Sequence, residues 1–277
     1  MAEKIYEPGF LPGPDVVEAF TDFVAIVRQL RRDCPWDREQ THESVKHLLV
    51  EEAYEVVEAI DRTNWEELKK ELGDILLHVV FHTAIAEGDG RFLLREVIET
   101  ESAKLIRRHP HVFGEVAVTG VGDVLANWER IKQTEGEGGS RSRGVLDGVP
   151  AQLPSLLRAY RMQEKAAAVG FDFDTPEAAW EKVDEELAEF NSAAGDVDAR
   201  EAELGDLLFA LVNYARLSGL HPENALRRTN AKFTSRVQYI EQKLAETARS
   251  MREVPLEELD RYWDEAKAFE PGNQPRH

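Results

Sequence analysis

The chain has 277 residues, of which 42% are apolar and 31% charged, and its formal net charge is −19 at pH 7. This length fits one large domain or two of ordinary size, and the apolar content is enough for a core. Such an acidic surface repels nucleic-acid polymers and anionic membranes, so we expect neither as a partner, and a phosphate-bearing ligand would need a cation to mediate its binding.

The N-terminal stretch MAEKIYEPGFLPGPD has no apolar segment of the kind found in signal peptides. No apolar run approaches the roughly 18 residues that span a bilayer. The single cysteine, Cys34, excludes an intrachain disulfide and suits a reducing compartment. These features predict a cytoplasmic protein.

Apolar residues recur at spacings of three and four along most of the chain, which predicts an all-α protein. Residues 16–32 have the pattern of an amphipathic helix. Thr41 or Ser44 is expected to cap a second helix that runs to about Arg62.

Asn64 is expected to cap a third helix, from Trp65 to about Glu87, which the GDG at 88–90 would end. Within it, LLHVVFHTAIA at 76–86 is the longest apolar run of the chain. Its length and its two histidines indicate a buried helix rather than a membrane span.

Two copies of one pattern follow each other in the same order. EEAYEVVEAI at 51–60 returns as EELAEFNSAA at 185–194. KKELGDILLHVVFHTAIA at 69–86 returns as REAELGDLLFALVNYARLS at 200–218. We interpret this similarity as a tandem duplication.

The Gly/Ser-rich stretch EGEGGSRSRG lies between the copies and is typical of a flexible linker. The predicted organisation is an N-terminal extension, a first domain, a linker, a second domain and a C-terminal tail, at residues 1–14, 15–135, 136–150, 151–271 and 272–277 respectively.

Carboxylates recur at helical spacing in both copies. Glu52 and Glu55 lie three residues apart, as do Glu71 and Asp74 on the next predicted helix, so each pair shares a helix face. A short connection makes the two helices antiparallel, which would bring the four acids together. The second copy offers the equivalent set Glu186, Glu189, Glu203 and Asp206.

Converging carboxylates repel one another unless a cation joins them, and oxygen ligands favour Mg²⁺, with Mn²⁺ as a substitute. A single such pair is usually a solvated helix face. The recurrence of the whole set beside an apolar run favours the metal site.

Several other residues suit a structural role better than a functional one. His78 and His82 could ligate a transition metal, but the second copy has Ala210 and Tyr214 there, so buried, hydrogen-bonded histidines are the preferred interpretation. For the equivalent aromatics Trp36 and Phe171, core packing is preferred to a lid beside the ligand. The ExxH in EQTH at 39–42 resembles part of a di-iron motif, but the second copy reads FDTP.

The motif EExxE followed by ExxD resembles the all-α nucleotide pyrophosphohydrolases of the MazG and dimeric dUTPase group. CPWDREQTH at 34–42, RRHPHVFG at 107–114 and the paired ELGD blocks resemble the tandem-domain MazG proteins in particular. The resemblance implies two four-helix-type bundle domains, a homodimer, and Mg²⁺-dependent hydrolysis of nucleoside triphosphates to the monophosphate and pyrophosphate. Water would attack the α-phosphorus, and deoxynucleoside triphosphates are further candidate substrates.

Carried over by motif, the implied metal ligands are the two sets of four acids named above. The implied substrate-binding residues lie in the second copy and are Lys182, Asn230, Lys232, Arg236 and Trp263, with Trp263 a candidate to stack on the base. A further family lysine has no clear match here, because Arg200 or Ala199 stands near its place. Glu51 and Glu185, the first acid of each EExxE, are the candidate general bases.

The two copies differ in their cations. Leu48 stands where the second copy has Lys182, so the second copy is expected to carry the main site. Two alternatives remain beside the broad enzyme. One is a house-cleaning pyrophosphatase selective for unusual nucleotides, and the other is a non-enzymatic helical interaction protein whose duplicated acids form a solvated face.

Overall fold

The computed structural model describes residues 11–124, 127–128, 131 and 144–268. Every regular element in these ranges is a helix, which confirms the all-α prediction. The chain divides into two compact units, Met1–Gly138 and Gly139–His277. The predicted extension and linker fall partly, and the predicted tail entirely, outside the described residues, so the domain limits proposed from the sequence remain predictions.

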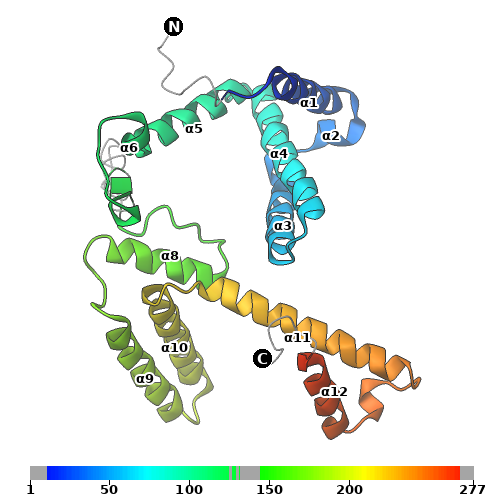
Figure 1. Ribbon diagram of the computed structural model, residues 1–277, viewed down its shortest axis with the longest axis vertical. Helices are drawn as coiled ribbons and strands as arrows, with labels where there is room; N and C mark the ends of the chain where they lie inside the picture. The colour runs from blue at the N-terminus through cyan, green and yellow to red at the C-terminus, as the bar shows by residue number, and fades with distance from the viewer. Residues whose placement is uncertain (1–10, 125–126, 129–130, 132–143, 269–277) are drawn as a thin grey trace. The chain divides into compact units, whose positions relative to one another are not determined.

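The described part of the first unit is built from long helices joined by shorter ones (Figure 1). Those with both ends among the described residues are α1 (Pro14–Asp33), α2 (Pro35–Glu39), α3 (His42–Asp61), α4 (Trp65–Gly88), α5 (Leu94–Arg108) and α6 (Pro110–Phe113). The most extensive contact is between α3 and α4, and α1 and α5 also pack against α4.

The second unit has a comparable order of helices. They are α8 (Ser155–Ala167), α9 (Pro176–Ser192), α10 (Val197–Leu217), α11 (Pro222–Ala245), the short 3₁₀ helix η2 (Met251–Glu253) and α12 (Leu256–Ala268). Here α9 and α10 make the most extensive contact, α8 packs on α10, and α12 packs on α11. None of the described helices is long and apolar enough to cross a membrane.

Side-chain caps fix where the paired helices begin. In the first unit, Thr41 and Ser44 form a reciprocal capping box, and the Asn64 side chain accepts a bond from the Glu67 amide at 3.2 Å. Both caps agree with the sequence prediction. In the second unit, Thr175 and Asp196 cap α9 and α10 in the same way. Because these caps satisfy otherwise unpaired amides, they set the register of each helix and hence the position of its acids.

The core of the first unit joins α1, α3, α4 and the start of α5. Its buried members are Val24, Val27, Val45, Val80, Phe81, Ile85 and Leu94. Three of them come from the apolar run at 76–86, which is therefore a buried helix segment as expected. In the second unit a smaller buried cluster, Ile240, Leu244 and Val254, joins α11 to the chain leading into α12.

An ion pair ties three helices of the first unit together. Glu87, at the end of α4, accepts two bonds from the Arg28 guanidinium of α1, at 2.8 and 3.1 Å, and one from the Leu94 amide of α5 at 3.1 Å. The Glu87 side chain is only 18% exposed, so this contact is less screened than an ordinary surface pair.

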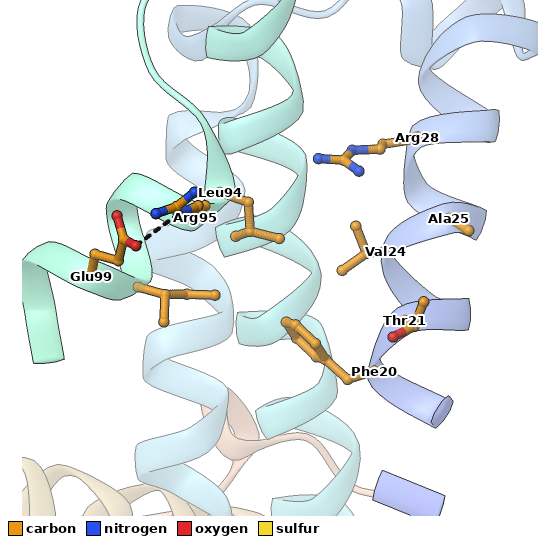
Figure 2. Close-up of a pocket in the computed structure, with 9 residues that line it drawn as sticks. Phe20, Thr21, Val24, Ala25, Arg28, Leu94, Arg95 and Glu99 are labelled. Atoms are coloured by element: carbon orange, nitrogen blue, oxygen red, sulfur yellow. Dashed lines mark hydrogen bonds and ion pairs between the residues drawn. The ribbon is translucent and has the colours of Figure 1, made fainter. Parts of the chain in front are cut away.

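We expect Glu87→Gln to lower the free energy of unfolding of the first unit by about 1–2 kcal/mol, because charge-assisted bonds to a half-buried carboxylate are lost. Urea unfolding followed by circular dichroism measures this. Glu99→Gln is the matched control, because its pair with Arg95 is exposed on both sides (Figure 2). The idea is wrong if the two variants are equally stable.

Candidate active site

The first acidic cluster lies between α3 and α4. Glu52 and Glu55, one turn apart on α3, and Glu71 on α4 each place a carboxylate oxygen within 4.8 Å of the others. Glu71 has no solvent exposure, whereas Glu52 and Glu55 are partly exposed. Asp74 follows Glu71 by one turn and is also partly exposed. The structure therefore brings together three of the four predicted ligands directly, with the fourth beside them.

The electrostatics of this cluster show that the acids repel one another. Burial and the charges of Asp74, Glu55 and Glu71 raise the pKa of Glu52. The charge of Glu71 is the main cause that raises the pKa of Glu55. The second oxygen of Glu71, Oε2, is buried and has no hydrogen-bond partner among the described residues. A buried carboxylate oxygen left in this state is unfavourable unless something positive meets it.

The second acidic cluster lies between α9 and α10 and repeats this arrangement. Glu186, Glu189 and Glu203 place carboxylate oxygens within 4.8 Å of one another. Glu186 is buried, Glu203 partly exposed and Glu189 exposed, and Asp206 is exposed one turn beyond Glu203. Burial and the charges of Glu189, Asp206 and Glu186 raise the pKa of Glu203.

Each cluster contains one lysine that partly neutralises it. Lys182 Nζ lies 2.6 Å from Glu186 Oε1 and 2.9 Å from Glu185 Oε1. In the first unit, Lys70 Nζ lies 2.8 Å from Glu71 Oε1 and 3.1 Å from Glu67 Oε1. These hydrogen bonds raise the pKa of both lysines, and the bond from Lys70 is the main cause that lowers the pKa of Glu71.

The sequence comparison of the two copies missed Lys70. It placed Leu48 opposite Lys182 and left the first copy without a cation. The structure supplies the ammonium from the other helix of the pair, at the position next to Glu71. The signal was present in the sequence KKELGD, but lysine beside glutamate on a charged helix is too common to be noticed without the fold.

The two candidate bases lie at the edge of the clusters. Glu51 and Glu185 are both exposed, and neither belongs to the groups of three acids. Glu185 accepts a bond from Lys182, which fixes its carboxylate beside the second cluster.

The other predicted substrate-binding residues form a separate group on α11 and α12. Arg236 lies over the Trp263 ring, 4.8 Å from its centre, and Phe233 meets the same ring edge-on at 5.4 Å. Asn230 and Lys232 are exposed on α11. Figure 1 shows α12 against the half of α11 that is farther from α9 and α10, so this group and the second acidic cluster occupy different parts of the unit.

Two expectations about aromatic residues are wrong. Trp36 and Phe171 were expected to pack in the core, but they are 59% and 82% exposed. Both lie in the short segments ahead of the helices that carry the ExxE pairs. Next to Phe171, Asp172 pairs with Arg216 of α10.

A groove of about 590 Å³ in the first unit lies between α1 and α5, apart from the acids. Figure 2 shows Phe20 and Val24 of α1 pointing across it towards Leu94 of α5. Its charged residues Arg28 and Arg95 are paired with Glu87 and Glu99. The groove contains no member of either acidic cluster.

The donor set at both clusters suits a hard divalent cation. All candidate ligands are carboxylate oxygens, which Mg²⁺ and Mn²⁺ prefer to nitrogen or sulfur. The raised pKa values and the unpartnered Glu71 oxygen indicate sites that a positive charge would stabilise. Such a cation, together with the adjacent lysine, would attract phosphate groups to an otherwise acidic protein.

Comparison with known proteins gives a consistent result. The family model described as the MazG nucleotide pyrophosphohydrolase domain matches residues 40–113, which include the first cluster. The chain is 44% identical over 250 residues to the nucleoside triphosphate pyrophosphohydrolase/pyrophosphatase MazG of Thermotoga maritima, covering 90% of this chain and 95% of that one. It is 39% identical over 254 residues to the nucleoside triphosphate pyrophosphohydrolase of Escherichia coli K12, covering 89% and 96%. It is also 44% identical over 272 residues to the uncharacterised protein YabN of Bacillus subtilis, of which it spans 55%.

Proposed function

Because the chain belongs to the MazG family of nucleotide pyrophosphohydrolases, we propose that it hydrolyses nucleoside triphosphates to the monophosphate and pyrophosphate. The observation that carries the proposal is the pair of acidic clusters, each built on two capped, antiparallel helices and each holding one lysine. A solvated acidic face would not place a fully buried carboxylate at its centre, as Glu71 is here.

We further propose that the clusters hold Mg²⁺, with Mn²⁺ as a substitute. Glu52, Glu55, Glu71 and Asp74 would hold it in the first unit, and Glu186, Glu189, Glu203 and Asp206 in the second. When bound, the cation supplies the positive charge that neutralises the triphosphate and the Lewis acidity that activates water.

Side chains of the protein bind the phosphate and accept the proton. Lys182 is positioned to bind phosphate oxygens once a cation replaces it at Glu186. Glu185 accepts the proton of the attacking water, and Glu51 has this role in the first unit. As the water oxygen bonds to the α-phosphorus, the bond from that phosphorus to the bridging oxygen breaks, and pyrophosphate leaves with the negative charge.

The second unit is proposed as the main site. Lys182 approaches its cluster on the same helix as two of the acids, and α11 adds Asn230, Lys232 and Arg236, with Trp263 to stack on the base. The first unit has its own acidic cluster and Lys70. At the offset that places Leu48 opposite Lys182, its sequence has no match for the cationic residues of α11.

The separation of α12 from α9 and α10 supports a homodimer, because a second copy could bring the α11–α12 group to the acids. Exposed apolar stripes on α4 and α10 also support it. Their members stand at equivalent positions with helical spacing and are Leu72, Leu76 and Val79 on α4, and Leu204, Leu208 and Leu211 on α10. Helix faces of this kind, directly beside the acids, are typical of surfaces that another helix covers.

We expect the double substitution Leu204→Glu and Leu208→Glu to turn a dimer into a monomer, because two carboxylates would be buried in an apolar contact. Light scattering after size-exclusion chromatography measures the mass directly. Glu201→Lys on the exposed side of α10 is the control and should leave the mass unchanged. A doubly substituted chain that stays dimeric would move the interface elsewhere.

The activity is tested with ATP, GTP, CTP and UTP, each with Mg²⁺ and with excess EDTA. We expect metal-dependent release of pyrophosphate, with the monophosphate as the other product. In ¹⁸O-labelled water the label should enter the monophosphate, because attack at the α-phosphorus puts the water oxygen there. Label in pyrophosphate, or release of single phosphate, contradicts the proposed reaction.

A further inference from the structure

Helices α5 and α11 are equivalent in the two units. Each follows the helix that carries an ELGD block, and they begin at Leu94 and Pro222. When the two helices are aligned at these first residues, SAKLIRR at 102–108 in α5 lies opposite NAKFTSR at 230–236 in α11. The offset that relates the acids does not show this match, because the chain between the ELGD block and the next helix is longer in the first unit. The first unit therefore has a counterpart of the α11 residues.

The match preserves the positively charged side chains. Lys104 stands opposite Lys232, and Arg108 stands opposite Arg236. Each pair has i, i+4 spacing, so its two members share a helix face. Residues 102–114 contain three lysines or arginines and two histidines but no acidic residue, in a chain whose net charge is −19. The end of α5 is therefore a basic region on an acidic protein.

A tryptophan accompanies the cations in both units. NWER at 127–130 is similar to YWDE at 262–265, which makes Trp128 the counterpart of Trp263. In the second unit Arg236 lies over the Trp263 ring. In the first unit the Trp128 ring lies beside the ring of His109, the residue directly after Arg108, with ring centres 6.2 Å apart. Each helix thus places its basic residues close to the matching tryptophan.

A simpler explanation covers only part of this arrangement. Cations in the last turn of a helix stabilise its dipole, which would account for Arg108 at the end of α5. Helix α11 continues to Ala245, however, so Arg236 lies far from its end and gains nothing from the dipole. The dipole also does not explain the tryptophan. A ligand that both units bind explains the shared residues better.

The helix pairs of the two units have diverged, whereas these cations and tryptophans have not. In the first unit His42 Nδ1 and His82 Nδ1 lie 2.8 Å apart. In the second unit Tyr214 stands in place of His82 and meets Trp180 edge-on, with ring centres 4.7 Å apart. His78 is buried and its Nδ1 has no partner among the described residues, so the prediction of hydrogen-bonded histidines is confirmed for His82 Nδ1 and wrong for His78 Nδ1. Residues that stay the same while the neighbouring helices change indicate a task that both units share.

The chemistry of these residues suits a nucleotide. Lysine and arginine bind phosphate oxygens through charge-assisted hydrogen bonds, and an aromatic ring offers a base a surface for stacking. Resting on the function proposed above, we propose that Lys104, Arg108 and Trp128 form a second nucleoside triphosphate-binding group, in the first unit, so that each chain binds two triphosphates. A phosphate there would displace Glu101, which pairs with Lys104 in the unliganded chain.

This binding group does not make the first unit the main site of turnover. A guanidinium covers the Trp263 ring, whereas a histidine takes this place against Trp128. Pro110 begins a new helix two residues after Arg108, so the basic helix is also shorter than α11. Figure 1 shows α6 at the end of α5 that is farther from α3 and α4, so the acids that complete this site would come from a second copy, as proposed for the second unit.

The test counts bound nucleotide on the full chain. ATP with a methylene bridge between its α- and β-phosphorus atoms is not hydrolysed at that bond, so its binding in the presence of Mg²⁺ is measured by isothermal titration calorimetry without turnover. We expect two molecules per chain. Trp263→Ala should leave one, and Lys104→Gln should weaken the other by at least about tenfold, because a charge-assisted bond is lost.

Two more variants assign the site in the first unit. Trp128→Ala should remove the same molecule as Lys104→Gln, and circular dichroism shows whether the variant is folded. Arg95→Gln is the matched control, because Arg95 lies on the same helix in an exposed pair with Glu99 and outside the matched residues. It should bind both molecules as the unsubstituted chain does.

Two results would overturn the inference. One is a single bound molecule per chain in the unsubstituted protein, and the other is two molecules that both Lys104→Gln and Trp128→Ala leave in place. Pyrophosphate release from ATP is measured on the same samples. Release with only one bound analogue rejects the second binding group and leaves the proposed function intact, whereas neither release nor binding rejects both.

Discussion

Replacing Glu203 with glutamine should lower pyrophosphate release by at least about 100-fold, because it removes one carboxylate from the cation site in the proposed main unit. The change preserves side-chain volume, and Glu203 is partly exposed, so the fold should be maintained. Steady-state release of pyrophosphate at saturating Mg²⁺ and triphosphate measures the effect. Circular dichroism and the melting temperature confirm that the variant is folded.

The duplication provides a matched variant for this test. Glu71→Gln alters the equivalent acid of the first unit. We expect it to reduce the rate by less than about tenfold, since the second unit is the proposed main site. If Glu71→Gln removes activity and Glu203→Gln does not, the first unit is the main site. If neither substitution matters, the acids are not catalytic and the proposed reaction site is wrong.

Mg²⁺ should stabilise the first unit strongly at pH 7 and weakly at pH 5. Burial and nearby carboxylates raise the folded-state pKa of Glu52, so its favourable contribution is complete below the unfolded pKa and is lost as pH rises through the folded pKa. At pH 7 the ionised acids repel, and a cation relieves that repulsion. A ligand at 100 times its Kd adds about 2.7 kcal/mol of stability, which is several degrees in melting temperature.

Glu52→Gln tests the cause of this effect. Without metal at pH 7 we expect it to raise the melting temperature of the first unit by a few degrees, because one repelling charge is gone. It should also reduce the shift that Mg²⁺ produces. Differential scanning calorimetry at pH 5 and pH 7, with NaCl at matched ionic strength, separates specific binding from screening. An unchanged Mg²⁺ shift in this variant would show that the cation binds elsewhere.

The sequence predicted the helix pairs well because their ends are set locally. Thr41 or Ser44 was expected to cap one helix and Asn64 the next, and Thr41 and Asn64 cap helices that begin at the next residue. The predicted ends at about Arg62 and Glu87 differ by one residue from the observed ends at Asp61 and Gly88. Capping depends on side chains within a few residues, so a single sequence contains the needed information.

The candidate site was predicted only in part, because its remaining contacts depend on how helices pack. The i, i+3 spacing of the acids requires only one helix and a short connection, and the clusters formed as expected. The position of Lys70 over Glu71 and the contact of His42 with His82 depend on side-chain placement within a packed helix pair. No periodic pattern in the sequence specifies either contact.

The exposed aromatics illustrate another limit. Large aromatic side chains usually anchor cores, yet Trp36 and Phe171 are mostly exposed in the folded chain. The type of a side chain indicates that it prefers burial. It does not say whether its own unit provides a core position for it. Motif comparison also could not predict that Trp263 lies on α12 beside Arg236 rather than beside the acids.

The side-chain contacts between the paired helices differ in the two units, and this difference has a consequence for biosynthesis. A chain that carries two similar helical hairpins can misfold by pairing α3 with α10, or α9 with α4, while both are still forming. Such a cross-paired hairpin would set His42 against Tyr214 and would lose both the His42–His82 contact and the Trp180–Tyr214 packing. The contacts within each helix pair thus stabilise only the pairing within its own copy. The differences that accumulated after duplication therefore help a nascent chain to sort its own helices.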